Sequence, residues 1–191
     1  MAYQTYITEA LVCGSTDSHT ADRSFLLFTR EAGMIFAHAK SVREERSKQR
    51  YALQDCSHIR VTLIRGKSGW KIAGVESFHN FYTLAKTRET RAFLRNTIHL
   101  LRRVVHGETS YKEIFDDVIS ACLKSEEYSH KKLELVLFAR ILHALGYIAS
   151  VKELEPLLKK EMPFSLIATL VPEDEEICRE AIDHALVQSQ L

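Results

Sequence analysis

The sequence predicts an α+β protein in which a small β barrel or sandwich is followed by an all-helical part. Two observations lead to this prediction. Through residue 76, apolar residues alternate with polar ones or form the short apolar runs typical of strands. From residue 78 onward, apolar residues recur every three or four positions, as they do on amphipathic helices. The chain has 191 residues, 46% hydrophobic and 27% charged, which suits one globular domain or two small ones.

Five segments are predicted as strands. They are YITEALVC (6–13), SFLLFT (24–29), GMIFAHA (33–39), HIRVTLI (58–64) and GWKIAGVE (69–76). In the fourth, Ile59, Val61 and Leu63 fall on one face while Arg60 and Thr62 fall on the other. The polar RGKS between the last two strands predicts a hairpin. Five short strands in about 75 residues are typical of a small antiparallel barrel or sandwich.

Helices are predicted over the rest of the chain: 87–107, from Thr109 or Ser110 to about Leu123, 131–147, around 150–159, and after Pro172. Gly107 is placed as a stop for the first of them. That helix has an apolar arc formed by Phe93, Leu94, Ile98, Leu101, Val104 and Val105. A basic stripe recurs on its opposite side, formed by Arg88, Arg91, Arg95, His99, Arg102 and His106. The helix at 131–147 is apolar nearly all round, which predicts a central buried helix.

Cysteine spacing and apolar run lengths exclude several classes of protein. Cys13, Cys56, Cys122 and Cys178 form no CxxC pair, so we expect no zinc ribbon, no other metal site and no cofactor. The N-terminus MAYQTYITEA does not resemble a signal peptide, and the longest apolar runs are well short of the roughly 18 residues of a membrane span. We therefore expect free buried thiols in a reducing cytoplasm.

Catalytic patterns are also absent from the sequence. RGKSG (65–69) resembles the end of a phosphate-binding loop, but Val61 occupies the position of its first glycine and the segment lies between two predicted strands. Asp116 and Asp117 are adjacent, so on a helix they point about 100° apart, and we expect both on a solvated face. His38 and His143 lie in apolar segments and are expected to be structural. The sequence does not predict an enzyme.

Positive charge is concentrated in the connection between the third and fourth strands. Between residues 40 and 50 it carries Lys40, Arg43, Arg46, Lys48 and Arg50, against only Glu44 and Glu45. Residues 1–75 hold eleven Lys and Arg against seven Asp and Glu, although the whole chain has a net charge of only +1. Such an asymmetry indicates a polyanion-binding N-terminal half.

This loop and the stripe of Arg88, Arg91, Arg95 and Arg102 would together form one phosphate track if their surfaces adjoin. Taken separately, each is also compatible with an ordinary solvated surface. Trp70, Tyr51 and Phe36 are candidates for base stacking, and each is equally a candidate core residue.

An ordered set of short motifs resembles the RecO family of bacterial recombination mediators. The set comprises EALV (9–12), DR (22–23), LFTRE (27–31), Gly33, AK followed by Arg43, LQ (53–54), RG (65–66) and ESF (76–78). KLELVLF through LGY (132–147) resembles the central helix of the same family. The resemblance implies an OB-fold barrel at 1–78 and a helical domain at 79–191.

The resemblance also implies a function. RecO-like proteins bind single- and double-stranded DNA, anneal complementary strands and assist loading of the RecA recombinase on DNA coated by single-strand-binding protein. They act with RecR and hold the acidic tail of the single-strand-binding protein on the helical domain. Lys131 and Lys132 stand where the family is basic, and we expect them beside an apolar cleft bordered by Leu133 or Leu137. A bacterial, nucleoid-associated location follows from the same resemblance.

The sequence departs from the family pattern in the basic loop and after the central helix. Ser41 replaces the glycine usual after AK, and Asp55–Cys56 replaces the usual Pro–Phe after LQ. Many members carry a cysteine zinc module where this chain continues to FSLIATLV, so we expect a short or divergent member without that module. The alternative is a protein-interaction adaptor whose helical lobe is the functional part.

Overall fold

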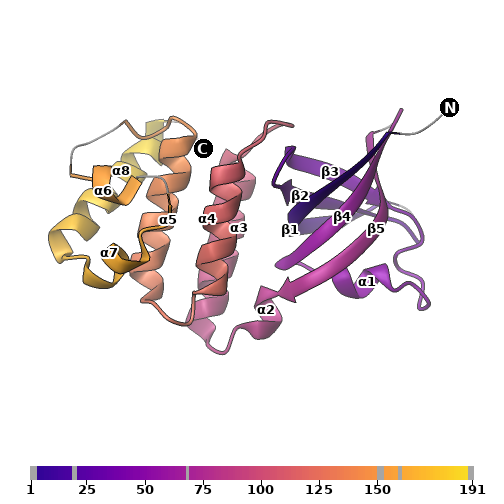
Figure 1. Ribbon diagram of the computed structural model, residues 1–191, viewed down its shortest axis with the longest axis horizontal. Coiled ribbons are helices and arrows are strands. Elements are labelled where there is room, and N and C mark those ends of the chain that lie inside the picture. The colour runs from indigo at the N-terminus through magenta and orange to yellow at the C-terminus, as the bar shows by residue number, and fades with distance from the viewer. Residues whose placement is uncertain (1–3, 19–20, 68, 150–152, 159–160, 189–191) are drawn as a thin grey trace. The chain divides into compact units, whose positions relative to one another are not determined.

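The computed structural model describes residues 4–18, 21–67, 69–149, 153–158 and 161–188. The chain divides into two compact units, drawn in Figure 1. The barrel unit is Met1–Leu84 with His106–Lys112, and the helical unit is Ala85–Val105 with Glu113–Leu191. The domain boundary placed between residues 78 and 79 stays a prediction.

Five strands close into a barrel: β1 (Thr5–Asp17), β2 (Arg23–Thr29), β3 (Gly33–Ala39), β4 (Ser57–Gly66) and β5 (Gly69–Asn80). Their order around the barrel is β1-β2-β3-β5-β4, and β1 also pairs with β4. Neighbouring strands are antiparallel except β3 and β5, which run parallel where Ala37 pairs with Trp70. This is the five-stranded architecture of an OB fold, so the predicted fold class is confirmed.

Alternation along the strands fills the barrel interior. Ile59, Val61 and Leu63 of β4 are each at most 1% exposed, as their spacing predicts, while Arg60 between them is exposed. The same inner face carries Phe25 of β2 and Ile35 of β3.

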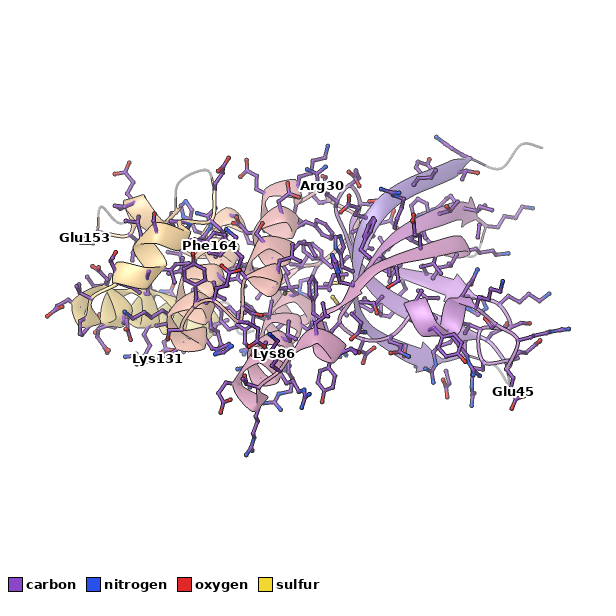
Figure 2. All side chains as sticks on the ribbon, turned by 60° about the horizontal axis from the view of Figure 1, so that its bottom comes forward. Arg30, Glu45, Lys86, Lys131, Glu153 and Phe164 are labelled. Atoms are coloured by element: carbon purple, nitrogen blue, oxygen red, sulfur yellow. The ribbon has the colours of Figure 1, made fainter. Side chains whose placement is uncertain are left out.

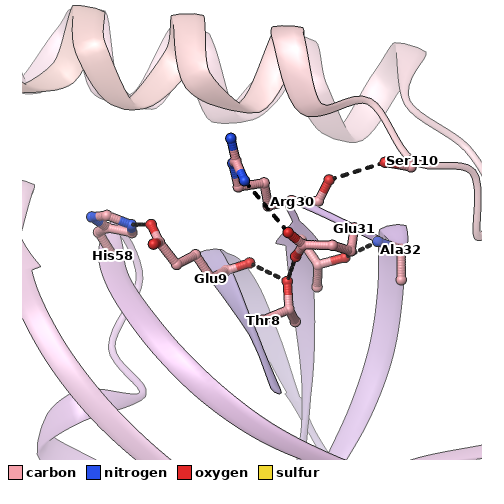
Figure 3. Close-up of polar contacts among 8 residues, drawn as sticks. Thr8, Glu9, Arg30, Glu31, Ala32, His58 and Ser110 are labelled. Carbon is pink, nitrogen blue, oxygen red and sulfur yellow. Dashed lines mark hydrogen bonds and ion pairs between the residues drawn. The ribbon is translucent and has the colours of Figure 1, made fainter. Parts of the chain in front are cut away.

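The segment His106–Lys112 packs against the turn between β2 and β3. The amide of Met34 donates to the Gly107 carbonyl (3.1 Å), and the Ser110 hydroxyl donates to the Arg30 carbonyl (3.2 Å; Figure 3). Gly33 has φ +64°, and a Cβ there would lie 2.7 Å from the Gly107 carbonyl oxygen, so only glycine fits without displacing the segment.

Those contacts correct two predicted helix ends. Ser110 does not cap a helix, because its hydroxyl is bonded to Arg30 and α4 begins at Lys112. Gly107 does not directly follow a helix, because α3 already ends at Val104. In both places a hydrogen bond to a residue distant in sequence occupies the group that the local sequence pattern assigned to a helix end.

Eight helices lie within the described residues: α1 (Gln49–Ala52), α2 (Phe81–Leu84), α3 (Arg88–Val104), α4 (Lys112–Leu123), α5 (His130–Ala144), α6 (Glu155–Leu158), α7 (Phe164–Thr169) and α8 (Pro172–Gln188). Helices α1, α2 and α7 are not predicted by the sequence, and parts of the predicted helix at 150–159 lie outside the described residues. Thr87 caps α3, its hydroxyl accepting from the Thr90 amide (3.0 Å).

Helix α5 is the centre of the helical unit, as predicted, and it packs against α3 and α8. Its residues Leu133, Leu137 and Ile141 are fully buried. The helix ends in a Schellman motif: Gly146 has φ +81° and donates to His143, and Tyr147 donates to Leu142.

Asp117, which was predicted to be solvated, is mostly buried. The Asp117 carboxylate accepts from Nε of Arg140 (2.7 Å), and the two side chains are 12% and 6% exposed. Arg140 also donates to the Leu157 carbonyl (2.8 Å). The prediction of a solvated face is therefore wrong for Asp117, because α5 presents a buried cation that requires a partner.

None of the helices within the described ranges is long and apolar enough to cross a membrane.

Candidate nucleic-acid interface

The basic loop, residues 40–50, is anchored where it leaves β3. The Ser41 amide donates to the Asp22 carboxylate (2.7 Å), and the Arg43 amide donates to the Ala21 carbonyl (3.1 Å). The Arg43 guanidinium also lies 3.4 Å from Asp17. These contacts fix the start of the loop against the connection between β1 and β2.

Apolar side chains anchor the loop and the residues that follow it. Val42 and Leu53 are 2% and 4% exposed and belong to the barrel core. Helix α1 lies between them, and the Cys56 amide donates to the Val12 carbonyl (3.0 Å). The loop therefore presents its cations on a fixed backbone, which lowers the entropic cost of binding a ligand.

The five cations differ in how strongly they are already paired. Arg46 is 88% exposed and donates to Glu44 (2.8 Å), whose pKa it holds below the usual range. Lys40 and Lys48 are exposed and form no ion pair within the part of the chain that the structure describes. Glu45 lies at the outer edge of the loop (Figure 2). Exposed pairs such as Arg46–Glu44 are weak, so all five remain available to a polyanion.

The outer face of β2 and β3 carries an exposed aromatic ring. Phe36 is 64% exposed because it points away from the core residues Ile35 and Ala37 on either side of it. It pairs across the strands with Leu26, and His38 in the next outer position pairs with Ser24. We call Ser24, Leu26, Phe36 and His38 the β2–β3 face.

Histidine 38 has a structural role, as predicted. Its Nε2 lies 3.2 Å from the Asp22 carboxylate, and its Nδ1 lies 3.4 Å from the hydroxyls of Ser18 and Ser24. His143 is likewise satisfied, with Nδ1 3.0 Å from the Ile148 carbonyl.

The turn between β4 and β5 adds cations that the sequence analysis did not single out. Lys67 and Lys71 are exposed, and Lys71 pairs with His38 across the parallel strands. The two lysines in RGKSGWK (65–71) are the sequence feature that could have predicted additional cations on this side of the barrel. Trp70 is a core residue at 9% exposure and offers no stacking platform, because Arg65 lies over its ring (4.6 Å).

In the helical unit, the basic stripe of α3 is solvent-exposed. Arg88, Arg91, Arg95 and Arg102 are all exposed, opposite buried Phe93, Leu94 and Leu101. Arg91 also donates to the Ala85 carbonyl (3.1 Å). A continuous track formed by this stripe and the basic loop stays a prediction.

The two lysines at the start of α5 have different surroundings. Lys132 donates to the Leu170 carbonyl (2.6 Å) and is 26% exposed, whereas Lys131 is 68% exposed and lies 3.0 Å from Glu175. Leu133 and Leu137 are fully buried, so they border no cleft. A pocket of about 510 Å³ lies elsewhere on α5, and its apolar lining includes Phe93, Leu135, Phe138 and Leu186. Its charged lining consists of the cations Lys131 and Arg179, the carboxylates Glu89, Glu134 and Asp183, and His130.

Within the described ranges, no three His, Cys, Asp or Glu side chains are grouped so that they could hold a metal ion.

The barrel unit is therefore an OB-fold domain whose β2–β3 face, the surface on which OB folds bind oligonucleotides, is bordered by cations. Residues 1–81 match the family model described as Recombination protein O N terminal. The barrel unit is therefore similar to the N-terminal domain of RecO proteins, and this match spans 81 of the chain's 191 residues.

Curated relatives extend the similarity beyond the barrel. The chain is 28% identical over 142 residues to the DNA repair protein RecO of Clostridium novyi (strain NT), covering 73% of this chain and 56% of that protein. It is 27% identical over 147 residues to the DNA repair protein RecO of Dehalococcoides mccartyi (strain CBDB1), covering 76% and 58%. The match to the DNA repair protein RecO of Heliobacterium modesticaldum is 35% over 79 residues, 41% of this chain and 29% of that protein. The chain thus spans a little over half the length of the first two relatives.

Proposed function

We propose that this protein is a non-enzymatic recombination mediator in DNA repair and that it binds DNA through its barrel. In this proposal the β2–β3 face takes bases, and the basic loop takes phosphates through Lys40, Arg43, Arg46, Lys48 and Arg50. The observation that carries the proposal is Phe36, which is 64% exposed in the middle of the face that OB folds use for oligonucleotides.

The names of the relatives support the biological setting of this proposal. A RecO-like protein would bind single- and double-stranded DNA, promote annealing, and assist recombinase loading on DNA coated by single-strand-binding protein. RecR is a candidate partner and the bacterial cytoplasm the expected location. The adaptor alternative, with the helical lobe as the functional part, predicts no DNA binding by the barrel.

Replacement of Phe36 tests the proposal. Stacking of a base on an aromatic ring contributes about 1–3 kcal/mol, so Phe36→Ala should weaken binding of a single-stranded oligonucleotide by about 5- to 150-fold. Phe36→Trp should retain affinity, and Phe36→Leu should behave like the alanine variant, because it keeps apolar volume but lacks a ring. Fluorescence anisotropy measures all three. Equal affinities for wild type and Phe36→Ala would refute base binding on this face.

We propose in addition that the pocket beside Lys131 holds the acidic tail of the single-strand-binding protein. Its apolar lining suits the apolar end of that tail. Lys131 and Arg179 are the cations that would meet the tail's carboxylates, and Glu89, Glu134 and Asp183 line the rest of the pocket. Lys132 would act indirectly, by holding the Leu170 carbonyl.

A peptide titration tests the tail site. A fluorescent tail peptide should bind wild type and the control Lys124→Glu, and should bind at least tenfold more weakly to a Lys131→Glu, Arg179→Glu variant. Lys124 is a suitable control because it is an exposed lysine outside the pocket lining. Equal binding to all three proteins would exclude this pocket as the tail site.

A further inference from the structure

A second pocket lies on the barrel unit, beside the two short helices. It has a volume of about 640 Å³, within the range of small-molecule sites. Ser15 and Arg23 line it from β1 and β2, and Arg50 and Tyr51 line it from α1. Residues 53–56 and Asn80, Tyr82 and Thr83 complete it, and we call it the α1–α2 pocket.

The α1–α2 pocket is distinct from the β2–β3 face. Ser15 pairs with Phe25, and Arg23 pairs with Ala39. Phe25 and Ala39 belong to the barrel core, so Ser15 and Arg23 project on the inner side of the strands. Phe36 projects on the outer side.

The pocket combines aromatic rings with guanidinium groups. Tyr82 is 52% exposed and Tyr51 is 63% exposed. The Arg50 guanidinium lies 4.7 Å from the centre of the Tyr51 ring and donates to the Tyr51 hydroxyl (2.7 Å), which holds the cation in place. Gln54 and Asp55 add side-chain donors and acceptors. Aromatic faces bind unstacked bases, guanidinium groups bind phosphates, and polar side chains pair with base edges.

The wall of the pocket is built rigidly around Asn80. Its side-chain nitrogen donates to the Asp55 carbonyl (3.1 Å) and the Ser57 hydroxyl (2.9 Å). Its oxygen accepts from the amide (2.9 Å) and hydroxyl (3.0 Å) of Thr83. Asn80 thereby ties the segment before β4 to helix α2, which carries Tyr82.

Cys56 contributes shape rather than chemistry. It has φ +65°, a strained conformation for a residue with a side chain, and the Phe81 amide donates to its carbonyl (3.1 Å). Burial raises the pKa of the Cys56 thiol to about 11, so at neutral pH it is not a nucleophile. The pocket therefore contains no reactive thiol at neutral pH.

We propose that the α1–α2 pocket receives one unstacked nucleotide of a DNA strand, with its base on the Tyr82 ring and its phosphate at Arg50. The inference rests on the proposed DNA-binding function and adds a second base-binding position on the opposite side of the strands from Phe36. Arg23 plays a smaller part, because Asp17 already pairs with it (2.8 Å).

The test compares two oligonucleotides of equal length, one of thymidines and one abasic, which keeps the phosphates but lacks bases. Tyr82→Leu should weaken binding of the thymidine oligonucleotide by about tenfold and leave the abasic one unchanged, while Tyr82→Phe should bind both like wild type. Ser15→Trp, which fills the pocket from an exposed position, should weaken binding of the thymidine oligonucleotide at least as much as Tyr82→Leu does, because it excludes both the base and the phosphate. Circular dichroism checks that each variant is folded.

The outcomes separate this inference from the proposed function. If wild type binds neither oligonucleotide, the proposed function fails and this inference fails with it. If Phe36→Ala weakens binding but Tyr82→Leu and Ser15→Trp do not, only this inference is overturned. Titration with thymidine monophosphate tests whether the pocket binds a free nucleotide instead of one within a DNA strand. The proposal would be overturned if the protein bound the monophosphate tightly, and if Tyr82→Leu abolished that binding without changing the affinity for the oligonucleotide.

Discussion

Ser41 has a backbone conformation that glycine adopts more readily. Its φ is +53°, in the left-handed region, and the RecO-like pattern has glycine at this position. The Ser41 amide is held by the Asp22 carboxylate (2.7 Å), which also lies 3.2 Å from His38. Asp22, the first residue of the DR pair in the RecO-like pattern, therefore has a physical role, since it fixes the turn from which the basic loop starts.

Ser41→Gly should stabilise the protein by about 0.5–1 kcal/mol. A left-handed backbone conformation destabilises a residue with a side chain by about 1–2 kcal/mol, and glycine removes this strain. Glycine also increases the conformational entropy of the unfolded chain, which lowers the stability by about 0.4–1 kcal/mol. Urea unfolding measures the difference. Ser47→Gly is the matched control: Ser47 lies in the same loop without a positive φ, so glycine there should destabilise slightly. A loss of stability in Ser41→Gly would contradict the strain argument.

His58 should make the stability of the barrel unit sensitive to acid. Its Nε2 lies 2.9 Å from the Glu9 carboxylate (Figure 3), and its ring stacks on Phe81. Burial lowers the pKa of His58 from 6.5, and the Glu9 hydrogen bond opposes this only in part. The unfolded chain therefore binds the proton more readily, so the contribution of His58 is present above about pH 6.5 and is lost as the pH falls below it.

The measurement is the free energy of unfolding from pH 8 to pH 5 for wild type and His58→Gln, which keeps a hydrogen-bonding side chain but does not titrate. Wild type should lose more stability than the variant between pH 6.5 and pH 5. Parallel profiles would show that His58 has the same pKa in the folded and unfolded chains.

At the scale of elements, the sequence predicts best where one periodic face is buried. Strand β4 and helices α3 and α5 follow directly from the positions of their apolar residues. Helix α7 was missed because six residues are too few to show a period. The start of α4 was misplaced because Ser110 is bonded to Arg30, which is 80 residues away. Asp117 was assigned to a solvated face, although Arg140 lies among the apolar residues of α5 and a buried cation requires an acidic partner.

The Asp117–Arg140 pair should couple α4 to α5 strongly. Removing one member of a buried ion pair leaves an uncompensated charge and costs about 3–5 kcal/mol, so Asp117→Leu and Arg140→Met should each destabilise by that amount. The double variant should cost less than either single variant, about 1–3 kcal/mol, because it buries no lone charge and only the Leu157 carbonyl loses its donor. Chemical denaturation measures the cycle. Additive losses in the double variant would mean that the two side chains are not coupled.

At the scale of the whole molecule, the charge asymmetry indicated the basic half of the chain, but neither of the two proposed binding surfaces could be located from the sequence. The α1–α2 pocket joins residues 15 and 23 with 50–56 and 80–83, and only strand register brings these segments together. The same holds for the β2–β3 face: Phe36 was named as a stacking candidate beside Trp70, and only the closed barrel separates the exposed ring from the buried one.

The salt dependence of DNA binding measures how much of the molecule engages one strand. Each phosphate contact on single-stranded DNA contributes about −0.7 to the slope of log K against log salt, so the five loop cations alone predict about −3.5. If Arg88, Arg91, Arg95 and Arg102 contact the same strand, nine contacts predict a slope of about −6. Under the proposed function we expect the steeper value, because the net charge of the chain is only +1 and a DNA-binding protein with so little overall attraction must bind through aligned local cations.

Two variants measure how much the barrel unit and the helical unit each contribute to the slope of log K against log salt. Changing the four α3 arginines to Gln should return it to about −3.5, and Lys40→Gln with Lys48→Gln should reduce its magnitude by about 1.4. Lys112→Gln with Lys124→Gln removes the same charge from exposed lysines outside both surfaces and should leave the slope unchanged. Anisotropy titrations between 50 and 200 mM salt supply the slopes. A wild-type slope near −3.5 that the α3 changes do not alter would confine the DNA to the barrel, and the arginines of α3 would then be an ordinary solvated face.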